Sequence, residues 1–460
     1  MAKEKAVVIM GLGLHGGGVG AANYFIEKGY RVTITDLKPE EELKESIERL
    51  KPSEKLRFIF GRHEYEDFRT PDLVVKNPAI PRNSPYISFA RKNGVPVDSD
   101  IGIFLELVKD RTRNIIGITG TKGKSTTSAL IYETLKKKFI NPILCGNITV
   151  SVFDVLKSIE NDSYLVMELS SFQLGDIKDK RYSPRIGVFT SFMEDHLNYY
   201  RTMDDYYEDK AVVYRWQRPG DVLVYGRDTD LTRLIRPNDG VGVYTFGLDP
   251  DFGGRGAFIR DGKIFFRNAE KEVEIIRIKD VRLPGSHNLY NVLAAATVAS
   301  IETVSPSAIA EAVSGFQGLD HRLEWAGEKN GVTFYNDSAA TNPDAVVMAI
   351  KSFSSPVTLL AGGSDKGLSL KTLVGIINSD VFQLVLLEGS GTARLIEEGL
   401  LEGYEVYGDI GEAVRHAYSV TEPGGIVLLS PGFASFGMFK NEFHRGNEFK
   451  KAVKEITAEE

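Results

Sequence analysis

The chain has 460 residues, of which 42% are hydrophobic and 26% charged, which is enough for about three globular domains with buried cores. Its 56 Lys and Arg against 63 Asp and Glu give a net charge of −7, which argues against a general nucleic-acid-binding protein. The single cysteine, Cys145, excludes a disulfide framework and favours a reducing compartment. The apolar run at residues 6–10 is too short for a secretory signal, and no stretch approaches the roughly 20 apolar residues of a membrane span. We therefore expect a cytoplasmic protein without membrane insertion.

Short apolar runs alternate with helical patterns, which predicts an α/β fold with mostly parallel sheets. Residues 1–108 are expected to form a Rossmann-like domain with strands at residues 6–10, 31–35, 73–76 and 95–97. The turn after the first strand, Gly11-Leu12-Gly13-Leu14-His15-Gly16, fits the pattern G-x-G-x-x-G, and Asp36 ends the second strand. Because such a turn suits any nucleotide diphosphate, it predicts a nucleotide site and leaves an NAD-dependent oxidoreductase open.

Residues 109–318 are expected to form a central domain that begins with a strand at residues 114–118 and a glycine-rich loop. The loop precedes a helix from about Ser125, as a phosphate-binding loop requires. Lys124 provides the charge for the β- and γ-phosphates, and the Ser125 hydroxyl is placed to bind Mg²⁺. The strict pattern has glycine at 118, where this chain has Ile118. Gly120 and Gly123 still leave room for phosphate, so the loop predicts ATP binding.

The same domain carries expected strands at residues 164–167 and 186–189. Glu168 follows the first of these, at the strand edge where α/β sheets bind ligands, and is a candidate to hold Mg²⁺ with Ser125. Asp261-Gly262 lies between two short strands and predicts a hairpin. We expect residues 222–282 to form an antiparallel patch appended to the central parallel sheet. Residues 319–460 are expected to form a second Rossmann-like domain, with strands at residues 332–335, 357–360, 384–387 and 425–429.

The phosphate loop, from Gly117 to Thr126, resembles the ATP loop of the Mur ligase family, and the resemblance extends over nearly the whole chain. The matching segments are Gly146-Asn147-Ile148, residues 168–174, Asp195-His196-Leu197 with Lys210, His287-Asn288 with Asn291, residues 318–324, Asn336-Asp337-Ser338, and Ala340-Thr341-Asn342. The glycine-rich start, the Ser-Ser-Phe-Gln-Leu run and residues 430–441 resemble the branch of the family that adds D-glutamate.

The resemblance implies an ATP-dependent ligase that joins D-glutamate to UDP-N-acetylmuramoyl-L-alanine through an acyl phosphate, in cytoplasmic peptidoglycan precursor synthesis. It implies two Mg²⁺ ions and a monomeric protein. The first domain would bind the UDP-linked substrate, the central domain ATP, and the third domain the amino acid. Lys210 would react with CO₂ to form a carbamate, which is chemically plausible because a lysine made partly neutral by its surroundings can add CO₂.

The implied site residues fall into five sets. The catalytic set is Lys124, His196 and Lys210. The ATP-binding set is Gly120, Thr121, Lys122, Gly123, Lys124, Ser125, Thr126, Asn288, Asn291, Arg322 and Asp337. The set for the UDP-linked substrate is Leu14, His15, Asp36, Asn77, Asn147 and Ser170. The set for D-glutamate is Thr341, Lys366, Ser435 and Phe436, and the metal set is Ser125, Glu168, His196 and Lys210.

Two departures from the family pattern bear on which amino acid is added. Ala339 stands where the family often has lysine, and Phe443 is displaced by one residue from the usual aromatic position. A sister ligase that adds another amino acid therefore stays open. A folylpolyglutamate synthetase does not account for the first domain, an NAD-dependent oxidoreductase does not account for the phosphate loop, and a non-catalytic nucleotide switch leaves the third domain without a role.

Overall fold

The computed structural model describes residues 4–14, 16–148, 150–196, 199–228, 230–249, 254–269, 271–399 and 403–458. The chain divides into two compact units. Unit 1 comprises Met1–Ile278 and Tyr290–Ala312, and unit 2 comprises Lys279–Leu289 and Val313–Glu460. Among the described residues, no helix has both the length and the apolar character needed to cross a membrane. His15 and Leu197, which belong to the motifs above, lie outside the described residues.

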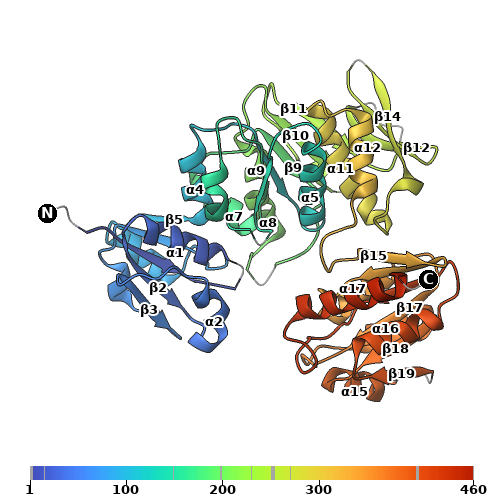
Figure 1. Ribbon diagram of the computed structural model, residues 1–460. Coiled ribbons are helices and arrows are strands. Elements are labelled where there is room, and N and C mark those ends of the chain that lie inside the picture. The colour runs from blue at the N-terminus through green and yellow to red at the C-terminus, as the bar shows by residue number, and fades with distance from the viewer. Residues whose placement is uncertain are drawn as a thin grey trace. The chain divides into compact units, whose positions relative to one another are not determined.

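The first sheet of unit 1 is parallel and has the strand order β3-β2-β1-β4-β5 (Figure 1, blue). Its strands are β1 (Ala6–Met10), β2 (Arg31–Asp36), β3 (Leu56–Phe60), β4 (Leu73–Lys76) and β5 (Val97–Ser99). Its helices are α1 (Gly17–Glu27), α2 (Glu40–Glu48), η1 (Tyr65–Phe68), α3 (Pro85–Lys92) and α4 (Asp100–Val108). The apolar residues of β1 are buried because a parallel sheet with connecting helices is covered on both faces.

The second sheet of unit 1 is also parallel, with the order β11-β10-β9-β6-β8-β7. Its strands are β6 (Ile115–Thr119), β7 (Ile143–Gly146), β8 (Leu165–Glu168), β9 (Ile186–Phe189), β10 (Val222–Gly226) and β11 (Gly242–Phe246). The accompanying helices are α5 (Lys124–Leu135), α6 (Val152–Val155), η2 (Leu156–Ser158), α7 (Ser171–Asp176), η3 (Lys178–Lys180), α8 (Met203–Lys210), α9 (Val212–Arg215), α10 (Leu231–Leu234), α11 (Ser286–Ile301) and α12 (Pro306–Gly315). The phosphate loop thus follows a central strand of this sheet.

The predicted antiparallel patch is a separate sheet, not an extension of the parallel one. It has the order β12-β13-β14 and consists of β12 (Gly256–Arg260), β13 (Lys263–Arg267) and β14 (Glu272–Arg277). The prediction was wrong for residues 222–246, because β10 and β11 pair in parallel with each other and β10 pairs with β9. The outermost strand, β11, is half-buried along most of its length, so it lacks the continuous apolar pattern of a central parallel strand.

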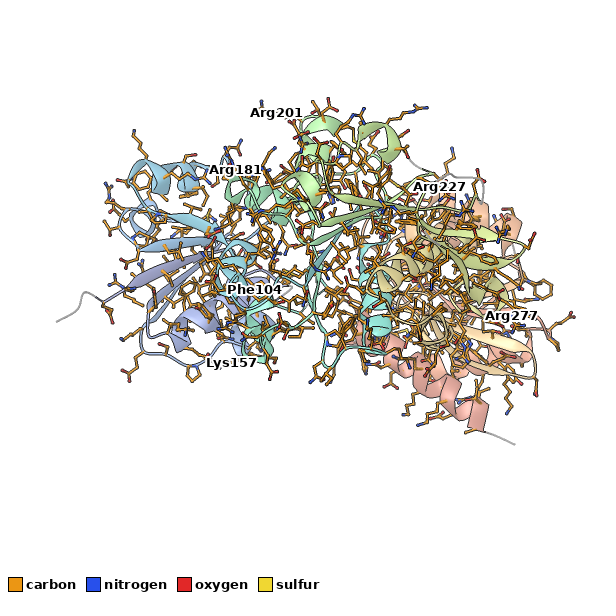
Figure 2. The ribbon with its side chains drawn as sticks, turned by 90° about the horizontal axis from the view of Figure 1, so that it is seen from above. Phe104, Lys157, Arg181, Arg201, Arg227 and Arg277 are labelled. Atoms are coloured by element: carbon orange, nitrogen blue, oxygen red, sulfur yellow. The ribbon has the colours of Figure 1, made fainter. Side chains whose placement is uncertain are left out.

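One hydrophobic core joins the two parallel sheets of unit 1. It contains Val7 of β1, Phe104 of α4 and Ile115 of β6, all of them buried. Figure 2 labels Phe104 among the densely packed side chains of this unit, whereas Lys157 is exposed. Because α4 packs within this shared core, it connects the two sheets as part of one folded unit.

Unit 2 is built on a six-stranded sheet with the order β15-β16-β20-β17-β18-β19. Its strands are β15 (Glu324–Lys329), β16 (Val332–Asn336), β17 (Val357–Gly362), β18 (Gln383–Leu387), β19 (Tyr404–Tyr407) and β20 (Ile426–Leu429). Its helices are α13 (Pro343–Ile350), α14 (Lys371–Asp380), α15 (Ser390–Glu397), α16 (Ile410–Ser419) and α17 (Glu442–Ala458), and η4 (Ile278–Asp280) lies at the junction with unit 1. Only β15 pairs antiparallel with its neighbour, so the sheet is mixed.

The predicted α/β class with two Rossmann-like domains around a phosphate-loop domain is confirmed. Several strands run one residue further than predicted, into the polar residues Asp36, Glu168 and Asn336, which are buried. The strand predicted at residues 95–97 starts instead at Val97. Val95 donates its N–H to Ala90 at the end of α3, and Pro96 has no N–H to give. The domain boundaries near 108 and 318 stay predictions.

Candidate active site

The phosphate loop turns from β6 into α5 at the carboxyl edge of the second sheet. Gly123 precedes the first turn of α5 with φ 84°, a left-handed conformation that favours glycine. A Cβ at position 123 would collide with Asn291 Oδ1, and one at position 120 would collide with the hydroxyl of Thr190. Both glycines are therefore required by close contacts. The N-terminus of α5, where the N-cap residue Gly123 has no side chain to intervene, is suited to hold an anion.

Residues directly after β9 hold the loop in shape. The Thr190 hydroxyl donates to Lys122 O at 2.6 Å, and Thr121 N donates to Ser191 O at 2.8 Å. The Lys124 ammonium lies inside the loop, 2.9 Å from the carbonyl oxygens of both Gly120 and Thr121. Thr190 and Ser191 were not predicted as site residues. Their signal in the sequence is their place after a buried parallel strand, at the same sheet edge as the loop.

Glu168 ends β8, the strand adjacent to β6, and is 1% exposed. One carboxylate oxygen accepts a hydrogen bond from Asn147 Nδ2 at 2.9 Å. The other oxygen, Oε2, has no hydrogen-bond partner among the described residues. An unpartnered buried carboxylate oxygen is costly unless a cation or a donor reaches it, so the position of Glu168 fits a metal ligand.

The described residues contain no group of three or more His, Cys, Asp and Glu side chains able to hold a metal ion. Mg²⁺ is bound in proteins largely through phosphate oxygens and water, with one or two protein carboxylates. Glu168 and the Ser125 hydroxyl in the first turn of α5 are the protein groups that fit such an ion.

Lys210, the last residue of α8, lies beside the phosphate loop although it is 90 residues away in sequence from Gly120. It is 1% exposed, its ammonium donates to Gly120 O at 2.7 Å, and it lies 4.6 Å from the ring centroid of Tyr206. Burial, assisted by the positive charge of Lys124, lowers the pKa of Lys210 well below its ordinary value of 10.5. A larger fraction of Lys210 is therefore in the neutral, nucleophilic amine form than for a lysine on the surface.

His196 has a φ of 55° and a side chain that is 42% exposed. Its ring centroid lies 5.1 Å from that of Phe172 and 5.8 Å from that of Tyr206. Burial lowers the pKa of His196 below 6.5, and the charge of Lys210 acts in the same direction. The neutral imidazole is thus favoured, which is the form able to accept a proton or bind a metal.

The predicted residues for a UDP-linked substrate shape two loops of unit 1. Asp36 accepts N–H groups from Gly13 and Lys38, and Asn77 Nδ2 donates to Gly11 O at 3.3 Å. Ser170 caps α7 through a reciprocal pair of hydrogen bonds with Gln173. Leu14 is exposed. The structure gives Asp36 and Ser170 internal partners, and their contacts with substrate stay predictions.

In unit 2, Asp337 follows β16 and is buried. It accepts hydrogen bonds from the Ser430 hydroxyl at 2.8 Å and from Leu323 N at 3.2 Å. Burial raises its pKa to about 7. Arg322 is exposed, and its charge partly opposes this rise.

The raised pKa predicts how the stability of unit 2 depends on pH. Because the pKa of Asp337 is about 7 in the folded protein against an ordinary 3.8, the folded state keeps a proton that the unfolded chain releases. Asp337 therefore stabilises unit 2 below about pH 4, and this contribution is lost as the pH rises towards 7. Asp337→Asn is expected to reduce this pH-dependent loss in the free energy of unfolding by up to about 4 kcal/mol.

Urea unfolding at several pH values checks this expectation. The chain has two tryptophans, Trp216 in unit 1 and Trp325 in unit 2, so a Trp216→Phe background makes the fluorescence report on unit 2. The difference in the free energy of unfolding between Asp337→Asn and the parent should change between pH 4.5 and 7.5. A constant difference over that range would contradict the assignment of a raised pKa to Asp337.

The predicted D-glutamate residues lie on loops at the carboxyl edge of the sheet in unit 2. Ser364, after β17, donates its hydroxyl to Phe436 O at 2.5 Å and its N–H to Ala434 O at 2.9 Å, which joins the two loops. Ser435 is buried, whereas Lys366 and Phe436 are exposed and Thr341 is half-buried. Their contacts with an amino acid stay predictions.

Arg445 was not predicted as a site residue, yet its side chain is fully buried behind these loops. It donates to the hydroxyl of Ser338 at 3.1 Å, to Ser338 O at 2.9 Å and to Phe433 O at 3.2 Å. It therefore fixes the loops around residues 338 and 433. Its signal in the sequence was its place two residues after Phe443, in the C-terminal stretch compared with the family pattern.

The predicted site residues fall into both units. Unit 1 brings together the phosphate loop, Asn147, Glu168, His196, Lys210 and Asn291. Unit 2 contains Asn288, Arg322 and Asp337 from the predicted ATP set and the whole predicted D-glutamate set. The assignments of these unit 2 residues to ATP and D-glutamate stay predictions.

Three family models match this chain. They are the MurD-like N-terminal domain of Mur ligases at residues 5–99, the Mur ligase middle domain at residues 118–299, and the glutamate ligase domain of Mur ligases at residues 321–433. The chain is 38% identical to the UDP-N-acetylmuramoylalanine–D-glutamate ligase of Roseiflexus sp. (strain RS-1), over 98% of this chain and 99% of that protein. It is 36% identical to the protein of the same name from Geobacillus sp. (strain WCH70), over 99% and 98%.

Solved structures show the same fold at low sequence identity. The UDP-N-acetylmuramate–alanine ligase MurC from Thermotoga maritima superposes with a TM-score of 0.56 at 18% identity, covering 98% of this chain and 99% of that one. MurF from Acinetobacter baumannii gives a TM-score of 0.57 at 16% identity, covering 86% and 93%.

Proposed function

The chain belongs to the Mur ligase family, and from this premise we propose that it joins D-glutamate to UDP-N-acetylmuramoyl-L-alanine with hydrolysis of ATP to ADP and phosphate. The full-length similarity to D-glutamate ligases carries the choice of substrates. An NAD-dependent oxidoreductase is not supported, because the family match extends over the nucleotide loop and the third domain as well as the first. The product would be a peptidoglycan precursor made in the cytoplasm, and the monomeric state stays a prediction.

We propose that residues 1–108 bind the UDP part of the substrate, residues 109–318 bind ATP, and residues 319–460 bind D-glutamate. The N-terminus of α5 and the Lys124 ammonium would hold the phosphates of ATP, with the glycines allowing their close approach. Transfer of the γ-phosphoryl group to the substrate carboxylate yields an acyl phosphate and ADP. The D-glutamate amine then attacks the acyl carbon, phosphate leaves, and an amide forms with loss of one proton.

Both partners in the first step are anions, so the site must neutralise charge. Mg²⁺ held by Glu168 and Ser125 would supply that neutralisation when bound, and His196 and Lys210 would be available for a second ion. Lys210 supports this role once its neutral amine adds CO₂, because the amine nitrogen bonds to carbon, one proton is released and the neutral side chain becomes a two-oxygen anion. The burial of Lys210 beside Gly120 supports the proposal.

Glu168→Gln tests the metal role, since it keeps an oxygen for Asn147 and removes the charge. We expect the Mg²⁺ concentration for half-maximal activity to rise by about tenfold or more, because a charged ligand has become neutral. The measurement is initial rate against Mg²⁺ at saturating ATP. Glu160→Gln, an exposed glutamate, is the matched control and should leave the midpoint in place. An unchanged midpoint for Glu168→Gln would remove Glu168 from the metal site.

Phosphate release from ATP and Mg²⁺ with UDP-N-acetylmuramoyl-L-alanine tests the proposed reaction. D-Glu, L-Glu, L-Lys and diaminopimelate are added in separate reactions. Release that depends on D-Glu alone is the expected result. Release with another amino acid would show that the protein is a ligase with a different amino-acid substrate. This alternative is informative because Ala339 and Phe443 depart from the family pattern. No release with any of them would refute the proposed function.

A further inference from the structure

An ionic network connects the first sheet of unit 1 to helices α7 and α8, with Lys76, Asp176 and Asp209 buried and Arg82 35% exposed. Lys76, the last residue of β4, is 3% exposed, and its ammonium lies 2.8 Å from the Asp176 carboxylate at the end of α7. Arg82, on the loop after β4, forms an ion pair with Asp209 of α8. The side of the first sheet contributes the two cations, and the helices contribute the two carboxylates. A buried carboxylate such as that of Asp209 is costly without a partner, so its pairing with Arg82 constrains where this end of α8 can lie.

Arg82 reaches α8 across Gly175 of α7, a position without a side chain. Gly175 of α7 leaves room there, since a Cβ at this position would collide with both the Asp209 carboxylate and the Arg82 guanidinium. Arg82 Nη1 also donates to Gly175 O at 3.0 Å. The guanidinium therefore connects the backbone of α7 to the side chain of α8, a geometry that uses its planar set of donors. Helices α7 and α8 pack side by side, as Figure 1 shows.

Asp209 directly precedes Lys210 on α8, and the two side chains have different environments. Successive residues on a helix point about 100° apart, so a contact on one can set the direction of the other. The Asp209 side chain is paired with Arg82 and is 4% exposed, while the Lys210 ammonium donates to Gly120 O of the phosphate loop. At its other end α8 is capped by the Thr202 hydroxyl, which accepts from Asp205 N. The Arg82 pair therefore anchors the end of α8 that carries Lys210.

We infer that Arg82 is a positioning residue, which acts through Asp209 to set the rotation of α8 and the place of Lys210 at the phosphate loop. This inference rests on the proposed function for its kinetic consequence. It gives the part of unit 1 built on the first sheet a role beyond substrate binding. Sequence motifs give no indication of it, because Arg82 and Asp209 are 127 residues apart.

The test compares Arg82→Gln and Asp209→Asn with Lys180→Gln. Lys180 pairs with Asp98 at 2.8 Å, also between the first-sheet side and the η3 segment, but without contact to α8, so it is the matched control. Arg82→Gln and Asp209→Asn are expected to lower kcat by about 10- to 100-fold, as a small misplacement of a reacting group does. KM for ATP and for the UDP-linked substrate should stay within about threefold of the parent values. The loss of kcat in the double variant should be no larger than that in the more impaired single variant. Lys180→Gln should keep kcat within about twofold.

Hydrogen exchange provides a second measurement that does not depend on enzyme activity. The backbone amides of residues 203–211 should exchange faster in Arg82→Gln than in Lys180→Gln and the parent protein. Arg82→Lys keeps a cation but loses the planar fork, and is expected to retain part of kcat. If Arg82→Gln does not fold, Arg82→Lys against Lys180→Gln carries the same comparison.

Three results would overturn the inference. A raised KM with unchanged kcat would make Arg82 a substrate-binding residue. An equal loss of kcat in Lys180→Gln would assign the effect to the interface as a whole. Unchanged exchange in residues 203–211 would show that α8 does not depend on Arg82. Absence of ligase activity in the parent protein would instead refute the proposed function, and the exchange comparison would still decide the positioning role.

Discussion

Replacing Lys124 with alanine is expected to lower kcat for D-glutamate-dependent phosphate release by about 10³-fold. The Lys124 ammonium lies inside the phosphate loop, 2.9 Å from the carbonyl oxygens of Gly120 and Thr121. A bound polyphosphate would compete for this cation with much stronger charge-assisted hydrogen bonds. Removing the ammonium takes away the charge held inside the loop, whereas the neighbouring Lys122 side chain is 71% exposed and pairs with Asp195.

Initial rates over a range of ATP concentrations, together with ATP binding by calorimetry, check this expectation. Lys124→Arg should not restore activity, because a planar guanidinium does not reproduce the compact ammonium that lies 2.9 Å from both Gly120 O and Thr121 O. Lys136→Ala is the matched control: Lys136 lies at the other end of α5, is paired with Glu133 on the surface and should keep kcat within about twofold. A Lys124→Ala enzyme with near-normal kcat would contradict the assignment of this loop to the phosphates of ATP.

Local patterns in the sequence were enough to predict much of the fold. The phosphate loop could be predicted because Gly120, Gly123 and Lys124 lie within five consecutive residues, and the chemistry that they serve requires this order. The same reasoning identified Glu168, since a polar residue after an apolar strand lies at the binding edge of a parallel sheet. The edge strand β11 was misassigned for the converse reason, because partial exposure gives a parallel strand the pattern of an antiparallel one.

Contacts between distant segments could not be predicted in this way. The hydrogen bond from Lys210 to Gly120 O joins residues 90 positions apart, and the Ser338–Arg445 contact joins residues 107 positions apart. Thr190 shapes the phosphate loop from the end of another strand, and its place after that strand indicates the sheet edge but not this contact. The resemblance to a family supplied Lys210 as a candidate. Only the fold explains why a lysine there is buried and has a lowered pKa.

Replacing Lys210 with methionine is expected to lower kcat by about 10³-fold while leaving the protein as stable as the parent or more so. Methionine has a similar volume and removes a buried amine whose burial is unfavourable, so the fold should not lose stability. The variant cannot form a carbamate, so the proposed anion beside the phosphate loop is lost. A large loss of activity at unchanged stability would separate a catalytic role of Lys210 from a structural one.

Four measurements decide this case. Urea unfolding compares the stabilities, and steady-state kinetics compares kcat with that of Lys157→Ala, an exposed lysine that should keep full activity. Incorporation of ¹³C-labelled bicarbonate, followed by NMR, should give a carbamate signal in the parent protein that is absent in Lys210→Met. Removal of CO₂ should lower the activity of the parent, and its return should restore it. Full activity of Lys210→Met would contradict a catalytic role. Loss of activity without a carbamate signal in the parent would leave Lys210 catalytic as an amine, because the neutral form that burial favours can act without CO₂.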